Sequence, residues 1–352
     1  MTVIASVILV LAGVGTCDVP LHSDLNRDCA VNFKDVQAMA EQWLAESGLA
    51  NLGGNDRIDM VDFAALSRDW GDTDGCDCNE CENWWTLHPE WIFCDDFDDG
   101  TPLRREGKYF EYGDDSSDFV PLAGIGINAS TGMRTVFQGG EVGAGGFKLA
   151  FGRVPSSYFD KGIRNTEDFR DIYYRMYLRN QAGWEGSPAK LSRATVFTGS
   201  NWSQAMIAHL WSSGDYLLVD PASGTDEQGN VVTTRYNDCA NLRWLGYKKG
   251  TTPIFGSGHD DKWYCIEAHV RLNDPGLSNG VQEFWIDGNL EARRSGLNFV
   301  GSYTDYGINA IFIENYWNSG SIKEQERYFD NFVVSTERIG CLCDRASNGL
   351  EP

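Results

Sequence analysis

Several short segments carry charged, imidazole and aromatic side chains at every second position. In WYCIEAHVRL, residues 263 to 272, an apolar set alternates with a polar set that contains Glu267, His269 and Arg271. Because successive side chains of a strand point to opposite faces, these three would share one face. Such a face either contacts solvent or lines a polar cleft.

Three further segments have the same alternation of polar or aromatic side chains. The sets that would share a face are Tyr173, Arg175, Tyr177 and Arg179; His209 and Trp211; and Phe312, Glu314 and Tyr316. If all these faces belong to one sheet, they form a groove with cations, imidazoles, a phenol and stacking rings. Grooves of this composition suit sugars, because pyranose rings stack on aromatic side chains and hydroxyl groups pair with charged ones.

Short segments rich in aromatic and β-branched residues, separated by Gly, Asn, Asp and Ser, fill residues 91 to 340. This pattern predicts strands. The clearest are residues 172–179, 204–211, 263–272, 281–288, 310–317 and 327–335. GAGGFK, residues 143–148, is interpreted as a turn. Because helices do not alternate with the strands, we predict a mainly β fold, a sandwich of antiparallel sheets, with a small N-terminal α-helical module.

The N-terminal stretch DLNRDCAVNFKD, residues 24–35, has the spacing of a calcium loop. Oxygen ligands are expected at its first, third, fifth, seventh and twelfth positions. These positions hold Asp24, Asn26, Asp28, Ala30, through its carbonyl, and Asp35. We therefore predict Ca²⁺ as a ligand. Cys29 occupies the position where a sharp turn favours glycine, and we predict that a disulfide to Cys76 or Cys78 offsets the strain.

A second copy of this unit, NLGGNDRIDMVD, begins at residue 51. Gly53 replaces an oxygen ligand there, so this loop is expected to bind calcium weakly or not at all. Apolar residues at helical spacing follow each loop, over residues 33–43 and 60–70. The spacing, the aspartate at the twelfth position and the paired helices resemble a dockerin. The resemblance implies a cohesin-type scaffold as partner, and a simple stalk-like module is the alternative.

The composition limits the partners and the location of the chain. Its 352 residues include 29 basic and 51 acidic ones, a net charge of −22, which argues against nucleic acid or an anionic membrane as partner. The apolar run at residues 2–16 has the length of a signal-peptide core and is too short to span a bilayer. We predict secretion; a lipid on Cys17 that attaches the chain to the cell surface is the alternative.

These features divide the chain into five segments. We predict a signal peptide at 1–17, the calcium module at 18–72, a Cys-rich linker at 73–90, the β domain at 91–340 and a tail at 341–352. Of the ten cysteines, Cys81 belongs to a cluster before the β domain and Cys341 to a pair after it. Disulfides could tie the two ends of the domain together, and zinc binding is the alternative.

The β domain resembles a known family in three stretches. WYCIEAHVRLNDPGLSNGVQEFWIDGNLEA, IFIENYWNSGS and YFDNFVVSTERIG are similar to the concanavalin-like jelly rolls of bacterial polysaccharide lyases, especially alginate and glucuronan lyases. The resemblance implies β-elimination at a uronic acid. In this reaction a cation or amide neutralises the carboxylate, a base removes the C5 proton and an acid protonates the leaving oxygen.

The resemblance suggests roles for the side chains of the expected groove. Arg175 or Arg193 would neutralise the carboxylate, His209 or His269 would be the base, and Tyr316 the acid. Lys190, in the segment SPAKLSRAT, is a substitute base or a substrate contact. The remaining predicted substrate contacts are Tyr173, Tyr177, Trp211, Glu267, Arg271 and Glu314.

Two other functions suit the same fold. A glycoside hydrolase needs two carboxylates that flank the scissile bond, and Glu267, Glu283 and Glu314 are the candidates. A lectin-like domain would bind polysaccharide without cleaving it. The sequence contains no P-loop, no dinucleotide fingerprint that opens a helix and no G-x-S-x-G motif.

Overall fold

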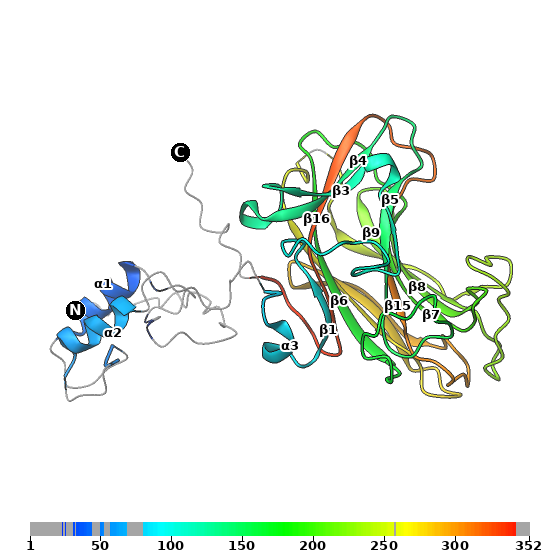
Figure 1. Cartoon of the computed structure of the whole chain (residues 1–352), viewed down its shortest axis with the longest axis horizontal. Helices are drawn as coiled ribbons and strands as arrows, with labels where there is room; N and C mark the ends of the chain where they lie inside the picture. The colour runs from blue at the N-terminus through cyan, green and yellow to red at the C-terminus, as the bar shows by residue number, and fades with distance from the viewer. Residues whose placement is uncertain are drawn as a thin grey trace, which may run out of the picture. The chain divides into compact units, whose positions relative to one another are not determined.

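The computed structural model of the chain describes residues 23, 25, 31, 33–43, 50–52, 57–68, 80–256 and 258–342 (Figure 1). The chain divides into two compact units. One comprises residues 1–80 with 342–352, and the other comprises residues 81–341. In the described ranges, no helix is long and apolar enough to cross a membrane.

The small unit contains the two predicted helices, α1 (Phe33–Glu41) and α2 (Met60–Arg68). Its core consists of Leu25, Val31, Met39, Ala50, Ile58 and Leu66. Asp35 and Asp62, which occupy equivalent positions of the repeat, both lie buried in the first turn of a helix. The predicted calcium ligands Asp24, Asn26, Asp28 and Ala30 lie outside the described residues, as do Cys29, Cys76 and Cys78.

The large unit is built from two eight-stranded antiparallel sheets. One, the β6 sheet, has the order β14-β13-β12-β6-β16-β4-β3, with β1 paired to β16. Its strands are β1 (Trp91–Asp95), β3 (Phe119–Ala123), β4 (Thr131–Phe137), β6 (Asp171–Asn180), β12 (Tyr264–Arg271), β13 (Gly280–Ile286), β14 (Asn289–Leu297) and β16 (Gln325–Ser335).

The other, the β7 sheet, has the order β10-β9-β8-β7-β15-β5-β2, with β11 paired to β9. Its strands are β2 (Glu111–Gly113), β5 (Gly143–Ala150), β7 (Lys190–Phe197), β8 (Gln204–Ser213), β9 (Tyr216–Ser223), β10 (Arg243–Trp244), β11 (Lys248–Pro253) and β15 (Ala310–Tyr316). Three short helical segments complete the unit: α3 (Trp84–Leu87), η1 (Asp115–Ser117) and η2 (Ile127–Ala129).

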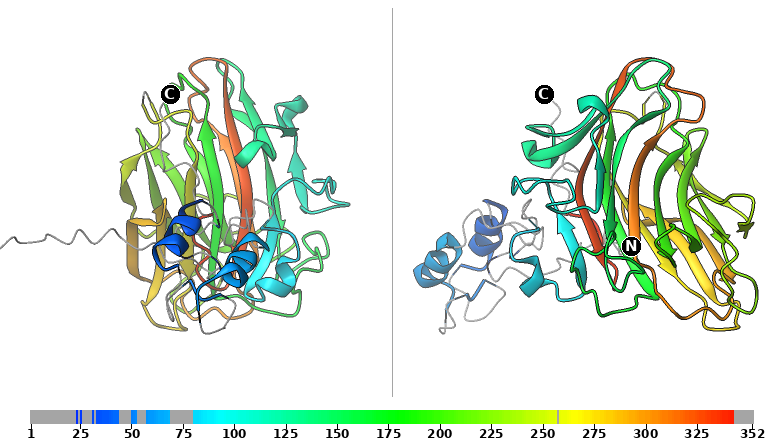
Figure 2. Two further views of the ribbon diagram at one scale, coloured as in Figure 1. Left: turned by 90° about the vertical axis from the view of Figure 1, so that its left-hand side faces the viewer. Right: turned by 45° about the vertical axis from the view of Figure 1, so that its right-hand side comes forward.

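The two sheets pack face to face, and Figure 2 shows their strands in two layers. Met176, Ile266 and Phe284 of the β6 sheet share one core with Val196 and Ala208 of the β7 sheet. Each strand predicted from alternation is present. The mainly β prediction is therefore confirmed for the large unit, because an apolar residue at every second position gives each strand one face for this core.

One prediction about local structure is corrected by the structure. GAGGFK belongs to strand β5 and is not a turn. Its glycines allow close packing, since a Cβ on Gly146 would lie 2.5 Å from the Ile313 carbonyl oxygen. The compact large unit begins at Cys81, within the segment predicted as a linker, and Cys81 and Trp84 pack against Trp91.

The core contains one unusual side chain, Arg327 on β16, which is fully buried. Its guanidinium lies 5.4 Å from the Trp184 ring and 5.7 Å from the Phe255 ring. Nε donates a hydrogen bond to Asn180 Oδ1 at 3.2 Å, while neither Nη atom has a partner in the described part of the chain. Burial lowers the pKa of Arg327 to about 9.

We expect Arg327→Met to raise the free energy of unfolding by about 1–4 kcal/mol, because it removes a buried, poorly solvated charge and keeps an apolar side chain of similar length. Urea denaturation at neutral pH measures the change. Arg235→Met is the control, since this arginine is exposed and its replacement should shift stability by less than about 0.5 kcal/mol. A loss of stability in Arg327→Met would contradict the expectation.

Candidate functional site

The β7 sheet carries a cleft of about 700 Å³ on the face turned away from the core. A second hollow of about 220 Å³ shares Lys190 and Asn237 with the cleft and reaches Trp211 and Trp244. Together they form one groove. Its polar and aromatic lining includes Arg105, Glu111, Lys148, Tyr158, Lys190, Tyr236, Asn237, Glu314 and Tyr316 in the cleft, and Arg193, His209, Trp211 and Trp244 in the second hollow.

Strand register brings the groove residues together. Directly paired residues of antiparallel strands point to the same face. Two rows of paired residues therefore cross the sheet on the outer face. One row is Lys148, Phe312, Arg193 and His209, and the other is Tyr316, Lys190 and Trp211.

Arg193 is almost fully buried and forms a bidentate pair with Glu314. Nε and Nη2 donate to the two Glu314 oxygens at 2.8 and 2.6 Å, and Nη1 donates to Asn237 Oδ1 at 2.6 Å. Burial disfavours the charge, but the Glu314 carboxylate more than offsets this, so the pKa of Arg193 is raised. The guanidinium is committed to groups of the protein itself, and it also fixes the orientation of the Asn237 amide.

Lys190 is half-buried and lies in the centre of the groove. Its Nζ is 4.0 Å from the centroid of the Tyr316 ring. No carboxylate in the described ranges forms an ion pair with it. Burial lowers the pKa of Lys190, and the attraction of Glu314 offsets this only in part. The groove therefore holds an ammonium group that loses its proton more easily than an ordinary lysine, next to a phenol.

His209 lies at the floor of the second hollow. Its Nδ1 is 2.9 Å from the backbone oxygen of Asp220. Because a carbonyl only accepts, Nδ1 carries the hydrogen and Nε2 has the lone pair. Burial and the nearby Arg193 lower the pKa of His209 well below its usual range, so the ring is neutral at pH 7. Its ring centroid lies 4.1 Å from that of Trp211 and 5.4 Å from that of Trp244.

Several groove residues were not among the predicted site residues, and four of them matter for the chemistry: Lys148, Tyr236, Asn237 and Trp244. Lys148 forms an ion pair with Glu111, and its Nζ lies 5.0 Å from the centroid of the Trp202 ring. Interpreting GAGGFK as a turn concealed Lys148. Tyr236 and Asn237 come from a loop, and Trp244 from a two-residue strand, so no periodic pattern marks them. Burial raises the pKa of Tyr236 to about 12, so its phenol keeps its proton at neutral pH.

The other predicted residues lie on the β6 sheet, on the opposite layer of the sandwich. They are Tyr173, Arg175, Tyr177, Glu267, His269 and Arg271. The structure therefore brings together Lys190, Arg193, His209, Trp211, Glu314 and Tyr316, and it separates these from the first six. The single groove expected if all the faces belonged to one sheet does not form.

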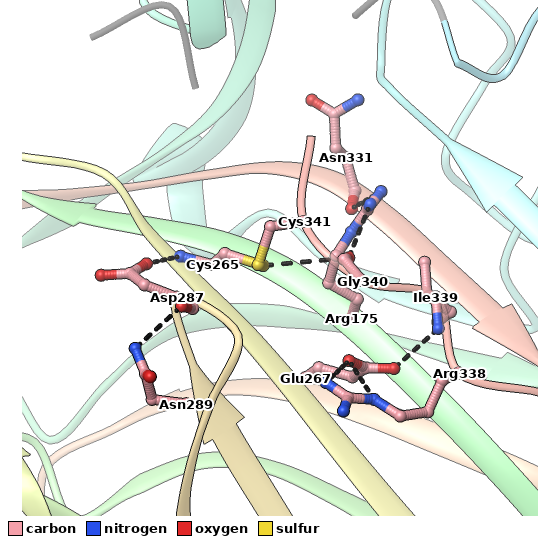
Figure 3. Close-up of a disulfide and its surroundings, with 10 residues drawn as sticks. All are labelled: Arg175, Cys265, Glu267, Asp287, Asn289, Asn331, Arg338, Ile339, Gly340 and Cys341. Carbon is pink, nitrogen blue, oxygen red and sulfur yellow. Dashed lines mark hydrogen bonds and ion pairs between the residues drawn. A yellow bond between two sulfur atoms is a disulfide. The ribbon is translucent and has the colours of Figure 1, made fainter. Parts of the chain in front are cut away.

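Glu267 and Arg175 hold the C-terminal segment 338–341 against the β6 sheet (Figure 3). Glu267 accepts hydrogen bonds from Arg338 Nη2 at 3.0 Å and from the backbone N–H of Ile339 at 2.7 Å. Arg175 Nη1 donates to the Gly340 oxygen at 3.2 Å, and Cys341 is bonded to Cys265. This arrangement anchors the end of the large unit.

His269 is enclosed by its own neighbours. Its Nδ1 lies 2.7 Å from Glu283 Oε1, and its Nε2 lies 2.7 Å from Asp171 Oδ1. The ring also stacks on Tyr173, with 4.1 Å between the ring centroids. Both nitrogens are thus occupied by carboxylates, which leaves no free nitrogen for a substrate proton.

Two disulfides are present in the described ranges. Cys81 is bonded to Cys94 and Cys265 to Cys341. Cys81 and Cys341 therefore form disulfides, which had been predicted in preference to zinc binding. Each disulfide ties its end of the unit to a nearby strand and not to the other end. Cys239, at the rim of the second hollow, is a free exposed thiol.

Two antiparallel sheets with a polar groove on one outer face define a jelly-roll-like β-sandwich. No protein-family model and no curated protein matches the sequence. Among solved structures, the chain is similar to an endo-β-1,4-glucuronan lyase from the fungus Trichoderma reesei, with 12% identity, a TM-score of 0.45, and coverage of 70% of this chain and 96% of that one.

Two alginate lyases show a similar level of likeness. For the marine PL-14 enzyme of Aplysia kurodai, identity is 13%, the TM-score is 0.42, and coverage is 63% of this chain and 88% of that one. For the enzyme of a Chlorella virus, identity is 10%, the TM-score is 0.43, and coverage is 73% of this chain and 97% of that one. At these identities and TM-scores the likeness carries no argument, and the function has to be argued from the groove.

We expect the double variant Cys265→Ser, Cys341→Ser to lower the free energy of unfolding by about 2–4 kcal/mol, because the bond closes a loop with a sequence separation of 76. Denaturant titration without a reducing agent measures it. Cys239→Ser is the control, since it removes a thiol that forms no disulfide. Equal stability of the double variant and the control would show that the Glu267 and Arg175 contacts alone hold the segment.

Proposed function

We propose that the chain is a secreted polysaccharide lyase that cleaves a uronic-acid polymer by β-elimination in the groove of the β7 sheet. The observation that carries the proposal is the pair of Lys190 and Tyr316. The lysine has a lowered pKa and forms no ion pair with the described carboxylates, and the tyrosine ring lies 4.0 Å from its Nζ, at the wall of an open cleft. A base and a proton donor side by side are what an elimination needs.

Neutralisation of the substrate carboxylate is assigned to Asn237. Its Oδ1 accepts a hydrogen bond from Arg193 at 2.6 Å and its side chain also hydrogen-bonds the Tyr236 phenol, so the remaining N–H of its NH₂ group is the donor left for a ligand. Asn237 lines both hollows, next to Lys190. Arg193 acts through this amide as a positioning residue. Donors fixed before the substrate arrives stabilise the charge that develops on the carboxylate when C5 is deprotonated.

The elimination then moves two protons and breaks the glycosidic bond. Neutral Lys190 takes the C5 proton, the electron pair forms the double bond between C4 and C5, and the bond from C4 to the glycosidic oxygen breaks. Tyr316 gives its phenolic proton to that oxygen. The products are a chain with an unsaturated uronate at its non-reducing end and a chain with a new reducing end. His209 supports the groove as a neutral ring between Trp211 and Trp244.

Lys190→Met and Tyr316→Phe should each lower kcat/KM by about 10²-fold or more, because each removes one proton-transfer group. Absorbance of the unsaturated uronate is followed with alginate, glucuronan, ulvan and pectate. Lys323→Met is the matched control, since this lysine pairs with Glu185 and does not line the groove. Lack of absorbance with all four polymers would contradict a lyase; new reducing ends without absorbance would indicate hydrolysis, and retention without cleavage would indicate binding alone.

The rate should rise with pH, because only the neutral amine of Lys190 accepts a proton. Burial lowers the pKa of Lys190, so the rise should end below the usual lysine value of 10.5. A pH profile of kcat/KM for the wild type, with Lys323→Met as control, measures it. A profile that is flat between pH 6 and 10 would contradict Lys190 as the base.

The hydrolase alternative receives less support. Glu314 is bound on both oxygens by Arg193, and Glu267 and Glu283 belong to the β6 sheet. The three carboxylates considered therefore do not flank one bond. Secretion is supported by the two disulfides, which are typical of chains that fold in an oxidising compartment.

The calcium module remains part of the proposal. Asp35 and Asp62 suit the twelfth position of a calcium loop, because both are buried carboxylates in the first turn of a helix. Asp35 would hold Ca²⁺ together with Asp24, Asn26, Asp28 and the Ala30 carbonyl, and the ion would stabilise this unit. A cohesin-type scaffold as partner is proposed from the dockerin resemblance alone.

Asp35→Asn should abolish high-affinity Ca²⁺ binding, whereas Asp62→Asn, in the loop that lacks a ligand at Gly53, should leave it nearly unchanged. Isothermal titration of the full chain with CaCl₂ measures both. Far-UV circular dichroism of each variant checks that the chain is folded. Equal loss of binding in the two variants, or no binding by the wild type, would contradict the assignment to residues 24–35.

A further inference from the structure

The groove continues past Lys190 toward an edge of the β7 sheet. The second hollow ends at Trp244, which is 42% exposed. Its ring centroid lies 5.9 Å from that of Trp211, and with His209 it forms a continuous aromatic surface. An exposed tryptophan above a hollow of about 220 Å³ offers a flat face of the size of one sugar ring.

Register places a second lysine on the same face. Lys190 pairs with Trp211, Trp211 with Leu218, and Leu218 with Lys249 of β11. Paired residues share a face, so Lys249 lies on the groove side, three strands from Lys190. The backbone separation is about 14 Å, because neighbouring strands lie about 4.8 Å apart. More than one sugar unit is needed to span it.

Lys249 is exposed, and its charge is available. Its Nζ lies 4.3 Å from the centroid of the Tyr216 ring, and no carboxylate in the described part of the chain pairs with it. The segment RWLGYKK, residues 243–249, contains Arg243, Lys248 and Lys249 and no acidic residue. By register Trp244 and Lys249 share the groove face, whereas Arg243 and Lys248, which pair with Ser223 and Val219, have the opposite orientation. In a chain with a net charge of −22, Trp244 and Lys249 form a local basic and aromatic strip at the end of the groove.

We propose that this strip is an outer subsite for uronate units of the same polymer chain that reacts at Lys190. One pyranose ring stacks on Trp244, and a carboxylate pairs with Lys249. The inference rests on the proposed function in taking a polyuronate as the ligand. It implies that the enzyme acts within long chains, because an oligomer too short to reach from Lys190 to Lys249 loses these contacts.

The subsite predicts a dependence on chain length. Trp244→Ala and Lys249→Met should each lower kcat/KM for the polymer about tenfold, the equivalent of about 1.4 kcal/mol. For the shortest oligouronate that is cleaved, the loss from Lys249→Met should disappear, and the loss from Trp244→Ala should be smaller than on the polymer. Trp85→Ala and Lys323→Met are matched controls, because Trp85 is exposed on α3 and neither residue lines the groove. Equal losses on polymer and oligomer, or no loss on either, would overturn the subsite.

A binding measurement separates this inference from the proposed catalysis. Affinity electrophoresis of Lys190→Met is run in gels that contain a polyuronate or neutral β-glucan, with and without the further changes at Trp244 and Lys249. Reduced retention in polyuronate supports the subsite even if the wild type cleaves nothing. Retention that is reduced no more than by Trp85→Ala overturns it. If Lys249→Met reduces retention equally in the neutral gel, carboxylate recognition by Lys249 is overturned.

Discussion

The buried pair of Arg193 and Glu314 is the interaction on which the groove depends. It neutralises a carboxylate in the lining of the groove, and it fixes the Asn237 amide through Nη1. Burial lowers the pKa of His209, the nearby Arg193 charge lowers it further, and the ring stays neutral. Breaking such a pair leaves an unpaired buried charge, so neither residue can change without its partner. The pair therefore sets the electrostatics of the site without contacting the reacting atoms.

The strands and the sandwich were predictable because they follow from alternation. Each buried strand must present one apolar face to a shared core, so every second residue of the strand is apolar. The same alternation predicted that Phe312, Glu314 and Tyr316 share a face. Lys190 and Arg193 are three residues apart and share the outer face only because the register shifts between Lys190 and Ser192. A chemical set on one strand can therefore be found from sequence when its strand is regular.

The assignment of faces to sheets was not predictable, because alternation is the same for both layers of a sandwich. Glu267, His269 and Arg271 have the residue types of a sugar groove. On β12, however, Glu267 binds the C-terminal segment, His269 binds Glu283, and Arg271 pairs with Asp171. Tyr236, Asn237 and Trp244 could not be predicted as site residues for a different reason. They come from loops and a very short strand, whose positions are set by tertiary contacts and not by any local period.

The net charge of −22 is a poor guide to the ligand of this groove. Exposed charges more than about 10 Å apart are largely screened at ordinary salt concentration, so a distant acidic segment has little effect on a cleft. Within the groove, Glu314 is paired with Arg193 and Glu111 with Lys148, which cancels two of the five negative charges of the lining, the others being Glu106, Asp115 and Asp220. Lys249 is left as a cation without a carboxylate partner in the described ranges, and Lys190, whose pKa burial lowers, adds no negative charge. An acidic protein can thus offer an anionic polymer a locally positive path, because pairing decides which charges a ligand meets.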